Sequence, residues 1–216
     1  MKISTTNYYT LLLVAALFLV HSSFTNIVSD GKSDFKKIEY QILPTSILEV
    51  NGKTNINSFC CSSKERFQNK NLSYKFEKQS SSIHFQDTKF SIKIKQLDCG
   101  KKIINKDLFK ALKANDYPNI TIDFKEVFNL ECNDLSDCDK WVEFEANADI
   151  TITCETLSIR IPILVKKLNT ESFRIAGGTT LQLCDFDIKA PTAMMGLIQV
   201  QDAIDFNFDL YVDVKL

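Results

Sequence analysis

Histidine is almost absent from this 216-residue chain, and glycine and proline are scarce. The chain has 2 histidines, 6 glycines and 4 prolines. His84 is the one histidine beyond the first 22 residues. It sits in a polar stretch, SSSIHFQD, which favours a surface or turn residue over a general base. We therefore predict no enzymatic activity and no catalytic residues, because no other constellation of acid, base and nucleophile stands out.

The chain also lacks an excess of charge of either sign. Its 26 basic and 27 acidic side chains leave a formal net charge of -1, which is not the basic surface expected of a nucleic-acid-binding protein. Phenylalanine, in contrast, is abundant at 16 residues. A chain with many phenylalanines and few helix or strand breakers can bury a large apolar interior, so we predict no nucleic-acid partner and a sizeable core.

The N-terminus predicts export. Lys2 precedes an apolar run from Tyr8 to Val20, and Ser22 and Thr25 follow among other small or polar residues. This order is typical of a secretory signal peptide, and the run is shorter than the roughly 18 to 20 residues that span a bilayer. Cleavage is expected after Ser22, or else after Thr25, with a retained anchor as the alternative.

These boundaries divide the chain into three parts. Residues 1–22 are expected to form the signal peptide, 23–38 a flexible lead-in, and 39–216 a single folded domain. The processed protein is expected to be a periplasmic or secreted bacterial protein.

All seven cysteines lie in the part that remains after cleavage, where disulfides can persist. The odd number leaves at least one thiol or an intermolecular link. Cys132 and Cys138 flank a polar tip and can staple a loop, and either Cys60 or Cys61 can pair with Cys99. A zinc site is the competing interpretation, but the paired CxxC spacing is absent, so no metal site is predicted.

An alternation of apolar and polar residues dominates from about residue 40 to the C-terminus. In the last segment, one face carries Ile204, Phe206, Phe208, Leu210, Val212 and Val214, and the other carries polar residues, among them Asp205, Asp209 and Asp213. A period of two predicts a strand with one buried face. We interpret the acidic face as solvated, in preference to a cation site.

The same alternation recurs often enough to predict about eight strands, antiparallel and with one dry face. Such strands can close into a barrel or pack as a two-sheet sandwich. The periodicity fits both folds equally well, and the length of the strands slightly favours the barrel.

Several interruptions are expected in this pattern. Residues 105–114 predict a short helix with Asn105 or Asp107 as its N-cap, ended by the Tyr117-Pro118 step. A turn is expected at Glu155 and Thr156, a hairpin turn at residues 176–178 (Ala-Gly-Gly), and a loop at 190–196.

Three stretches together resemble the YceI-like family of exported polyisoprenoid-binding proteins, in its Bacteroidota-type members. The first is residues 48–59 (LEVNGKTNINSF). The second is residues 107–120, which contain DLF, then Leu112, then DYPNI. The third is residues 183–196, which contain LCDFDI, then APTA and Gly196. The resemblance covers about residues 40–214. The chain departs from the family pattern at Asp187, Lys106 and Cys154, which leaves the ligand open.

The resemblance implies a lipocalin-like, extended antiparallel barrel of eight strands with a long isoprenoid or similar amphipathic chain inside it. It thereby selects the barrel over the sandwich. It also implies a transport or storage protein that needs no cofactor, binds a hydrophobic or amphipathic lipid, and has transient contact with a membrane. The expected ligand-binding residues of the interior are Phe90, Ile92, Ile94, Ile120, Ile122, Phe124, Phe144, Ile150, Ile152, Ile159, Ile161, Phe206 and Phe208.

The alternative is a structural or adhesion domain whose core is filled by its own side chains, because phenylalanine and isoleucine are core residues by default.

Overall fold

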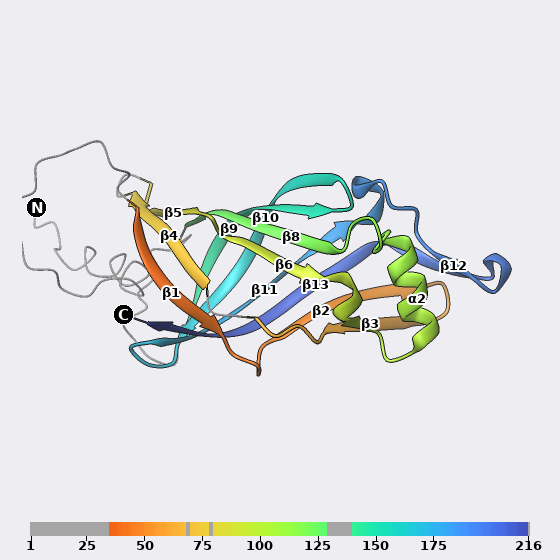
Figure 1. Ribbon diagram of the computed structural model, residues 1–216, viewed down its shortest axis with the longest axis horizontal. Helices are drawn as coiled ribbons and strands as arrows, with labels where there is room; N and C mark the ends of the chain where they lie inside the picture. Colours follow the sequence, from red (N-terminus) through yellow and green to blue (C-terminus); the bar gives the residue numbers. More distant parts are fainter. Residues whose placement is uncertain (1–34, 68–69, 78–79, 129–139, 216) are drawn as a thin grey trace, which may run out of the picture.

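The protein is an extended antiparallel β-barrel with a helix at one end (Figure 1). The computed structural model describes residues 35–67, 70–77, 80–128 and 140–215. The strands are β1 (Lys36–Ile42), β2 (Ile47–Thr54), β3 (Ser58–Ser63), β4 (Lys70–Glu77), β5 (Ser82–Gln86), β6 (Lys89–Lys93), β7 (Leu97–Asp98), β8 (Asn119–Phe128), β9 (Trp141–Ile152), β10 (Glu155–Lys167), β11 (Ser172–Gln182), β12 (Thr192–Ala193) and β13 (Ile198–Lys215). The α-helix is α2 (Lys102–Ala111), and short 3-10 turns are η2 (Ile94–Gln96), η3 (Leu183–Phe186) and η4 (Met194–Gly196).

The ring runs β1-β4-β5-β8-β9-β10-β11-β13 and closes where β13 pairs with β1. The predicted eight-stranded antiparallel barrel is thereby confirmed. Two of its walls are extended by shorter strands. β13 pairs with β2 as well as with β1, and β6 continues the β5 edge along β8. Because of these extensions the barrel is much longer than it is wide (Figure 1).

The alternation read from the sequence corresponds to the two faces of the wall. On β13, Ile204, Phe206, Phe208, Val212 and Val214 are buried, and most of the intervening residues are exposed or half-buried. β9 alternates in the same way through most of its length. The buried residues of all long strands form one cluster inside the ring, so the hydrophobic interior is continuous from end to end.

The helix begins three residues earlier in the chain than the sequence predicts. It spans Lys102–Ala111, and its N-cap, Lys101, makes no side-chain capping bond. The helix therefore ends well before the Tyr117-Pro118 step predicted to end it, and Asp107, the other predicted cap, lies inside it. The predicted cap Asn105 lies inside the helix. There its Oδ1 accepts a bond from the Cys99 backbone N–H (2.7 Å), and its Nδ2 donates to Asp98 Oδ1 (2.9 Å). The side chain that would cap the helix therefore fixes the preceding loop instead.

Two predicted turns are also wrong in position. The β9–β10 turn lies at Thr153 and Cys154, with Thr153 at a φ of 56°, so Glu155 already belongs to β10. Cys154 is consequently exposed and not on the apolar face. Residues 176–178 lie in the middle of β11, where the small residues make room for side chains of β13 and not for a turn.

The predicted loop at 190–196 contains the short strand β12 and the 3-10 turn η4. β1 begins at Lys36, so its first residues fall in the segment expected to be a lead-in. The signal peptide and its cleavage site, and the pair Cys132 and Cys138, lie outside the described residues. None of the helices described between residues 35 and 215 is long and apolar enough to cross a membrane.

Candidate ligand-binding interior

Two cavities occupy the interior of the barrel. One, of about 620 Å³, lies under α2, and the other, of about 220 Å³, lies further along the barrel between β1, β5 and β13. Ile122 and Phe206 line both, so the two cavities are neighbours separated by these side chains. The larger volume lies within the range of about 300 to 1,000 Å³ that is typical of small-molecule sites, and the smaller volume lies below it.

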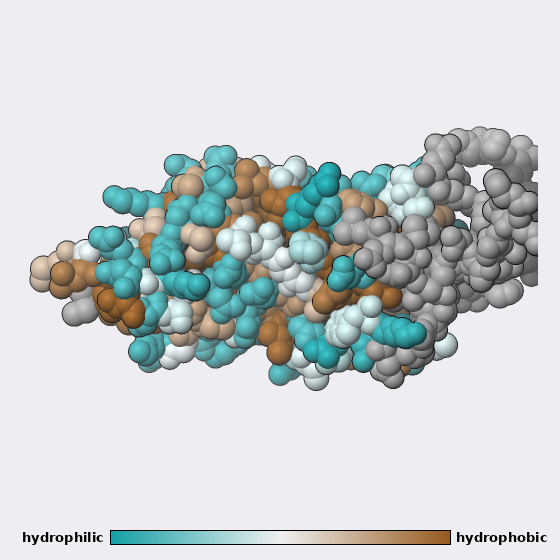
Figure 2. All heavy atoms as spheres, turned by 180° about the vertical axis from the view of Figure 1, so that it is seen from behind, coloured by the Kyte–Doolittle hydropathy of each residue, from teal (hydrophilic) through white to brown (hydrophobic). Residues whose placement is uncertain are grey.

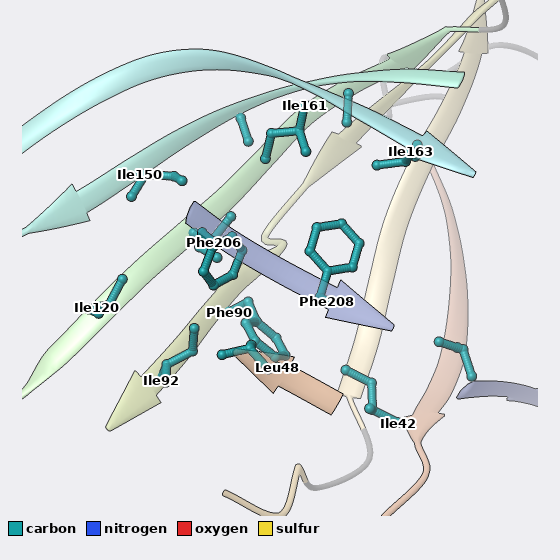
Figure 3. Packing of buried hydrophobic residues seen from close by; sticks show 14 of the residues in the cluster. Ile42, Leu48, Phe90, Ile92, Ile120, Ile150, Ile161, Ile163, Phe206 and Phe208 are labelled. Carbon is teal, nitrogen blue, oxygen red and sulfur yellow. The ribbon is translucent and has the colours of Figure 1, made fainter. Parts of the chain in front are cut away.

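The smaller cavity has an almost wholly apolar wall. Its lining residues are Tyr40, Ile42, Leu48, Leu72, Ile83, Phe85, Thr88, Phe90, Ile122, Phe124, Val127, Phe144, Ile163, Val165, Ile175, Phe206, Phe208, Leu210, Val212 and Val214. Figure 3 shows how Phe206 and Phe208 project from β13 into the space that Phe90 and Leu48 border from other strands. The ring centroids of Phe206 and Phe208 lie 6.0 Å apart, and the two rings form part of one continuous apolar surface.

Among the described residues that line this cavity, Tyr40 and Thr88 are the only two with polar side chains. The Thr88 hydroxyl donates to the Phe124 carbonyl oxygen (2.5 Å) and to Asp123 Oδ1 (3.0 Å), so its polarity is used within the wall. Burial raises the pKa of the Tyr40 phenol, which keeps the group neutral. The smaller cavity therefore accepts apolar groups and offers no charge.

The larger cavity lies between α2 and the barrel. Ile104, Leu108 and Ala111 of the helix line it together with Ile120, Ile150 and Ile152 of the opposite wall. No residue of α2 is fully buried, because its apolar side faces this hollow. Polar and charged residues, among them Asn57, Lys101 and Asp107, join the lining here. An amphipathic molecule can therefore place polar groups at this end and not at the other.

A disulfide and a polar cluster tie the start of α2 to the wall. Cys61 on β3 is bonded to Cys99, which settles the pairing that the sequence left open between Cys60 and Cys61. Asp98 accepts hydrogen bonds from Asn105 Nδ2 and from the Gly100 backbone N–H, both at 2.9 Å, and pairs with Lys64 Nζ at 2.5 Å. The helix is thus anchored at its N-terminal side above the larger cavity.

The structure brings most of the expected ligand-binding residues to these cavities. Phe90, Ile120, Ile122, Phe124, Phe144, Ile150, Ile152, Phe206 and Phe208 line one or both of them. Ile92, Ile94 and Ile161 are inward-facing and buried but border neither cavity, because neighbouring atoms fill the space around them. Ile159 is only partly buried and also lies outside both.

Many other lining residues were missing from the expected set, among them those of β1, β2, β4, β5 and α2 and several on β10, β11 and β13. Tyr40, Leu48 and Leu72 come from short strands, in which the alternation extends over too few residues to stand out. Leu108 and Ala111 come from α2, and the helical spacing of its apolar residues was the signal that could have identified them.

The outer face of β13 is bonded to its neighbouring strand. Arg174 donates from Nε to Asp209 Oδ1 (2.8 Å) and from Nη2 to Asp209 Oδ2 (2.5 Å), and Thr180 Oγ1 donates to Asp205 Oδ1 (2.7 Å). Ser172 Oγ donates a hydrogen bond to Asp213 Oδ1 (2.7 Å). The three aspartates of this face, Asp205, Asp209 and Asp213, therefore bind β13 to β11. Within the described parts of the chain, no group of three His, Cys, Asp or Glu side chains could hold a metal ion.

His84 lies on β5 with Ser82 and Glu126 beside it, a combination that invites comparison with a catalytic triad. Ser82 Oγ lies 3.2 Å and Glu126 Oε1 3.5 Å from the same ring nitrogen, Nε2. A triad needs the nucleophile and the carboxylate on different ring nitrogens. The cluster therefore lacks the geometry of a triad, and none of its three residues lines either cavity.

No family model matches the sequence, and no curated protein matches it either. Solved structures match its fold. BcnA of Burkholderia cenocepacia is 16% identical, with a TM-score of 0.58 over 77% of this chain and 95% of its own. A polyisoprenoid binding domain from Saccharophagus degradans, implicated in plant cell wall breakdown, is 11% identical, with a TM-score of 0.58 over 82% of this chain and 98% of its own.

A YceI protein of Campylobacter jejuni is 15% identical over the whole of both chains, with a TM-score of 0.49. At the identities of the first two matches the likeness establishes the fold, and a Bacteroidota origin stays a prediction. The chain therefore has the fold of BcnA and of the polyisoprenoid binding domain, the lipocalin-like extended barrel that its resemblance to the YceI-like family implies.

Proposed function

We propose that this protein is an exported carrier that holds one long apolar or amphipathic chain, a polyisoprenoid or a similar lipid, inside its barrel for transport or storage. The observation that carries the proposal is the pair of cavities that meet at Ile122 and Phe206. Together they form an elongated apolar space, which suits a chain better than a compact ligand.

The walls supply the affinity that such a chain needs. Each methylene-sized unit that leaves water for an apolar cavity gains about 0.8 kcal/mol, so several units bind without any specific polar contact. The polar residues near α2, such as Asn57 and Lys101, then favour a ligand whose head group lies at that end. The alternative, a structural domain with a self-filled core, does not account for cavities of this size.

The fold and the disulfide support the other parts of the proposal. One of the proteins with this fold is described as a polyisoprenoid binding domain. The Cys61–Cys99 disulfide is the kind of bond that persists in a periplasmic or secreted protein. We include cleavage of the signal peptide and transient contact with a membrane in the proposal, because a water-insoluble chain has to be collected from a lipid phase.

The direct test is mass spectrometry of an organic extract of the processed protein purified from its native host, followed by titration of the lipid-free protein with a fluorescent isoprenoid probe. We expect one bound lipid per barrel and saturable probe uptake. Finding neither bound lipid nor probe uptake would refute the carrier role.

A pair of variants on β8 sharpens the test. Ile122→Trp places a large ring at the junction of the two cavities, whereas Thr121→Trp adds the same ring on the other face of the strand. We expect Ile122→Trp to reduce probe uptake and Thr121→Trp to leave it near the parent value, with circular dichroism as the check on folding. Equal uptake by both variants would place the ligand outside the interior.

A further inference from the structure

Large hydrophobic side chains are exposed together at the end of the barrel that α2 covers. Ile56 is 65% exposed, Ile103 69%, Leu197 73% and Met195 fully exposed. They come from three separate segments, the β2–β3 hairpin, the first turn of α2 and the loop between β12 and β13. We call these four residues the apolar tip. In Figure 2 hydrophobic residues gather at this end of the molecule, and Figure 1 places the three segments there.

The apolar tip surrounds the larger cavity. Ile103 lines the cavity itself, as do Asn57 next to Ile56 and Ile198 next to Leu197. The hairpin and the β12–β13 loop are joined by hydrogen bonds, from Asn55 Nδ2 to the Leu197 carbonyl oxygen (2.9 Å) and from the Gln199 backbone N–H to Asn55 Oδ1 (3.0 Å). These bonds hold the apolar side chains outward at the rim.

Exposed lysines flank each segment of the apolar tip. Lys53 precedes the hairpin, Lys101 and Lys102 precede Ile103, and Lys189 precedes the β12–β13 loop. None of the four has an ion-pair partner among the residues that the structure describes. Residues 51–57, 101–111 and 183–202 contain these segments, and together they carry six lysines against the four aspartates Asp107, Asp185, Asp187 and Asp202, which leaves a small excess of positive charge.

Apolar side chains surrounded by lysines are complementary to the surface of an anionic lipid bilayer, which has an apolar interior beneath negatively charged head groups. The apolar groups enter the boundary between head groups and acyl chains, and each nearby lysine adds electrostatic attraction to an anionic surface. We propose that the apolar tip docks on an anionic lipid surface, so that a chain passes between the bilayer and the larger cavity without crossing water. This inference rests on the proposed carrier function for its purpose, but docking itself is measured separately.

The experiment is flotation of the lipid-free processed protein, its N-terminus verified by mass spectrometry, with vesicles of phosphatidylcholine alone or with phosphatidylglycerol added. The vesicles contain no isoprenoid. We expect binding only or mainly to the anionic vesicles. Met195→Ser with Leu197→Ser is expected to weaken binding by about tenfold or more, because the variant no longer transfers two large apolar side chains from water into lipid.

Two controls separate docking from general stickiness. Leu164→Ser with Leu168→Ser removes exposed leucines from the opposite end of the barrel and is expected to leave binding unchanged. Replacing Lys53, Lys101, Lys102 and Lys189 by glutamine is expected to remove the preference for anionic vesicles. Met195→Trp in a Trp141→Phe background is expected to show a blue shift of its fluorescence when anionic vesicles are added, and an unshifted spectrum would argue against insertion of the tip.

Each outcome has a defined meaning. Absence of vesicle binding, or equal binding by the Met195/Leu197 variant and the parent, overturns the docking proposal even if the protein takes up isoprenoid probe from solution. A change in oligomeric state on mutating the tip, without a change in vesicle binding, also overturns it and assigns the tip to a second copy. Vesicle binding without probe uptake supports docking and refutes the carrier role.

Discussion

Gly177 on β11 and Phe208 on β13 are cross-strand partners, and the phenyl ring of Phe208 takes the space that a side chain on Gly177 would need. A Cβ atom built on Gly177 would lie 2.8 Å from Cζ of Phe208 and 2.8 Å from the carbonyl oxygen of Pro162. Because Phe208 lines the smaller cavity, this glycine lets the ring lie against the wall and leaves the space open.

Gly177→Ala is therefore expected to lower the free energy of unfolding by about 1 to 3 kcal/mol, the usual cost of overpacking. It should also push the Phe208 ring into the smaller cavity and weaken uptake of an isoprenoid probe. Urea denaturation and probe titration measure the two effects. Ala176→Ser, on the opposite face of the same strand, is the control, and a Gly177→Ala protein with unchanged stability and uptake would contradict the packing.

Phe206 provides a second test, because it is buried and borders both cavities. Phe206→Asp places an unpaired carboxylate in the apolar interior and is expected to destabilise the protein by at least about 3 kcal/mol, or to abolish folding. Asn207→Asp introduces the same charge at the adjacent, exposed position, where water solvates it, and is expected to cost far less even though Glu49 lies opposite. Retained stability and ligand uptake in Phe206→Asp would mean that this face points outward.

The long strands could be predicted because their faces differ so clearly. In β9 the alternation lasts for all 12 residues, and in β13 it runs without a break from Ile204 to Lys215, so a slip of one residue would reverse every side chain. Alternation assigns a residue to a face but does not say how tightly that face is packed. Ile92 and Ile161 were therefore expected at the ligand, yet both are buried among neighbouring atoms away from the cavities.

The misplaced turn and helix have a different cause, which is contact between residues that are not local in sequence. Gly177 indicates a turn when only its neighbours are considered, whereas its real role depends on Phe208 in another strand. Asn105 is a good N-cap by residue type, but Cys99 and Asp98 engage its side chain. Such competition is decided by the folded chain and leaves no local pattern.

The disulfide is expected to stabilise the barrel substantially. Cys61 and Cys99 are 38 residues apart, and the chain-entropy relation gives about 4 kcal/mol for a loop of that length. Cys61→Ala with Cys99→Ala should lower the free energy of unfolding by up to that amount and speed amide exchange in α2. Cys60→Ala, at an exposed and unbonded cysteine, is the control. Equal stability of the double variant and the control would show that the bond contributes little.

The number of thiols is a further prediction. Among the described cysteines, Cys60, Cys154 and Cys184 are free. If Cys132 pairs with Cys138, labelling of the denatured, non-reduced protein should find three thiols per monomer; otherwise it should find five, the seven cysteines less the Cys61–Cys99 pair. An even number would require a covalent dimer or a modified cysteine, which non-reducing electrophoresis and mass spectrometry distinguish.

Asp98 should make the anchoring of α2 sensitive to acid. The hydrogen bond from Asn105, the contact with Lys64 and the Gly100 backbone N–H hold the pKa of this carboxyl well below its usual range. The unfolded chain therefore takes up the proton first as the pH falls. The stabilisation is complete at neutral pH and is lost as the pH drops below the unfolded value of about 3.9 towards the lower folded value.

Asp98→Asn is accordingly expected to be less stable than the parent at pH 7, with a difference that shrinks as the pH is lowered from about 5 to 2. Amide exchange in α2 should be faster in the variant at pH 7, and release of a bound probe should be faster too, because α2 covers the larger cavity. Asp116→Asn, at an exposed position beyond the helix, is the matched control. A stability difference that stays constant over this pH range, or unchanged exchange in α2, would mean that the Asp98 carboxylate does not anchor the helix.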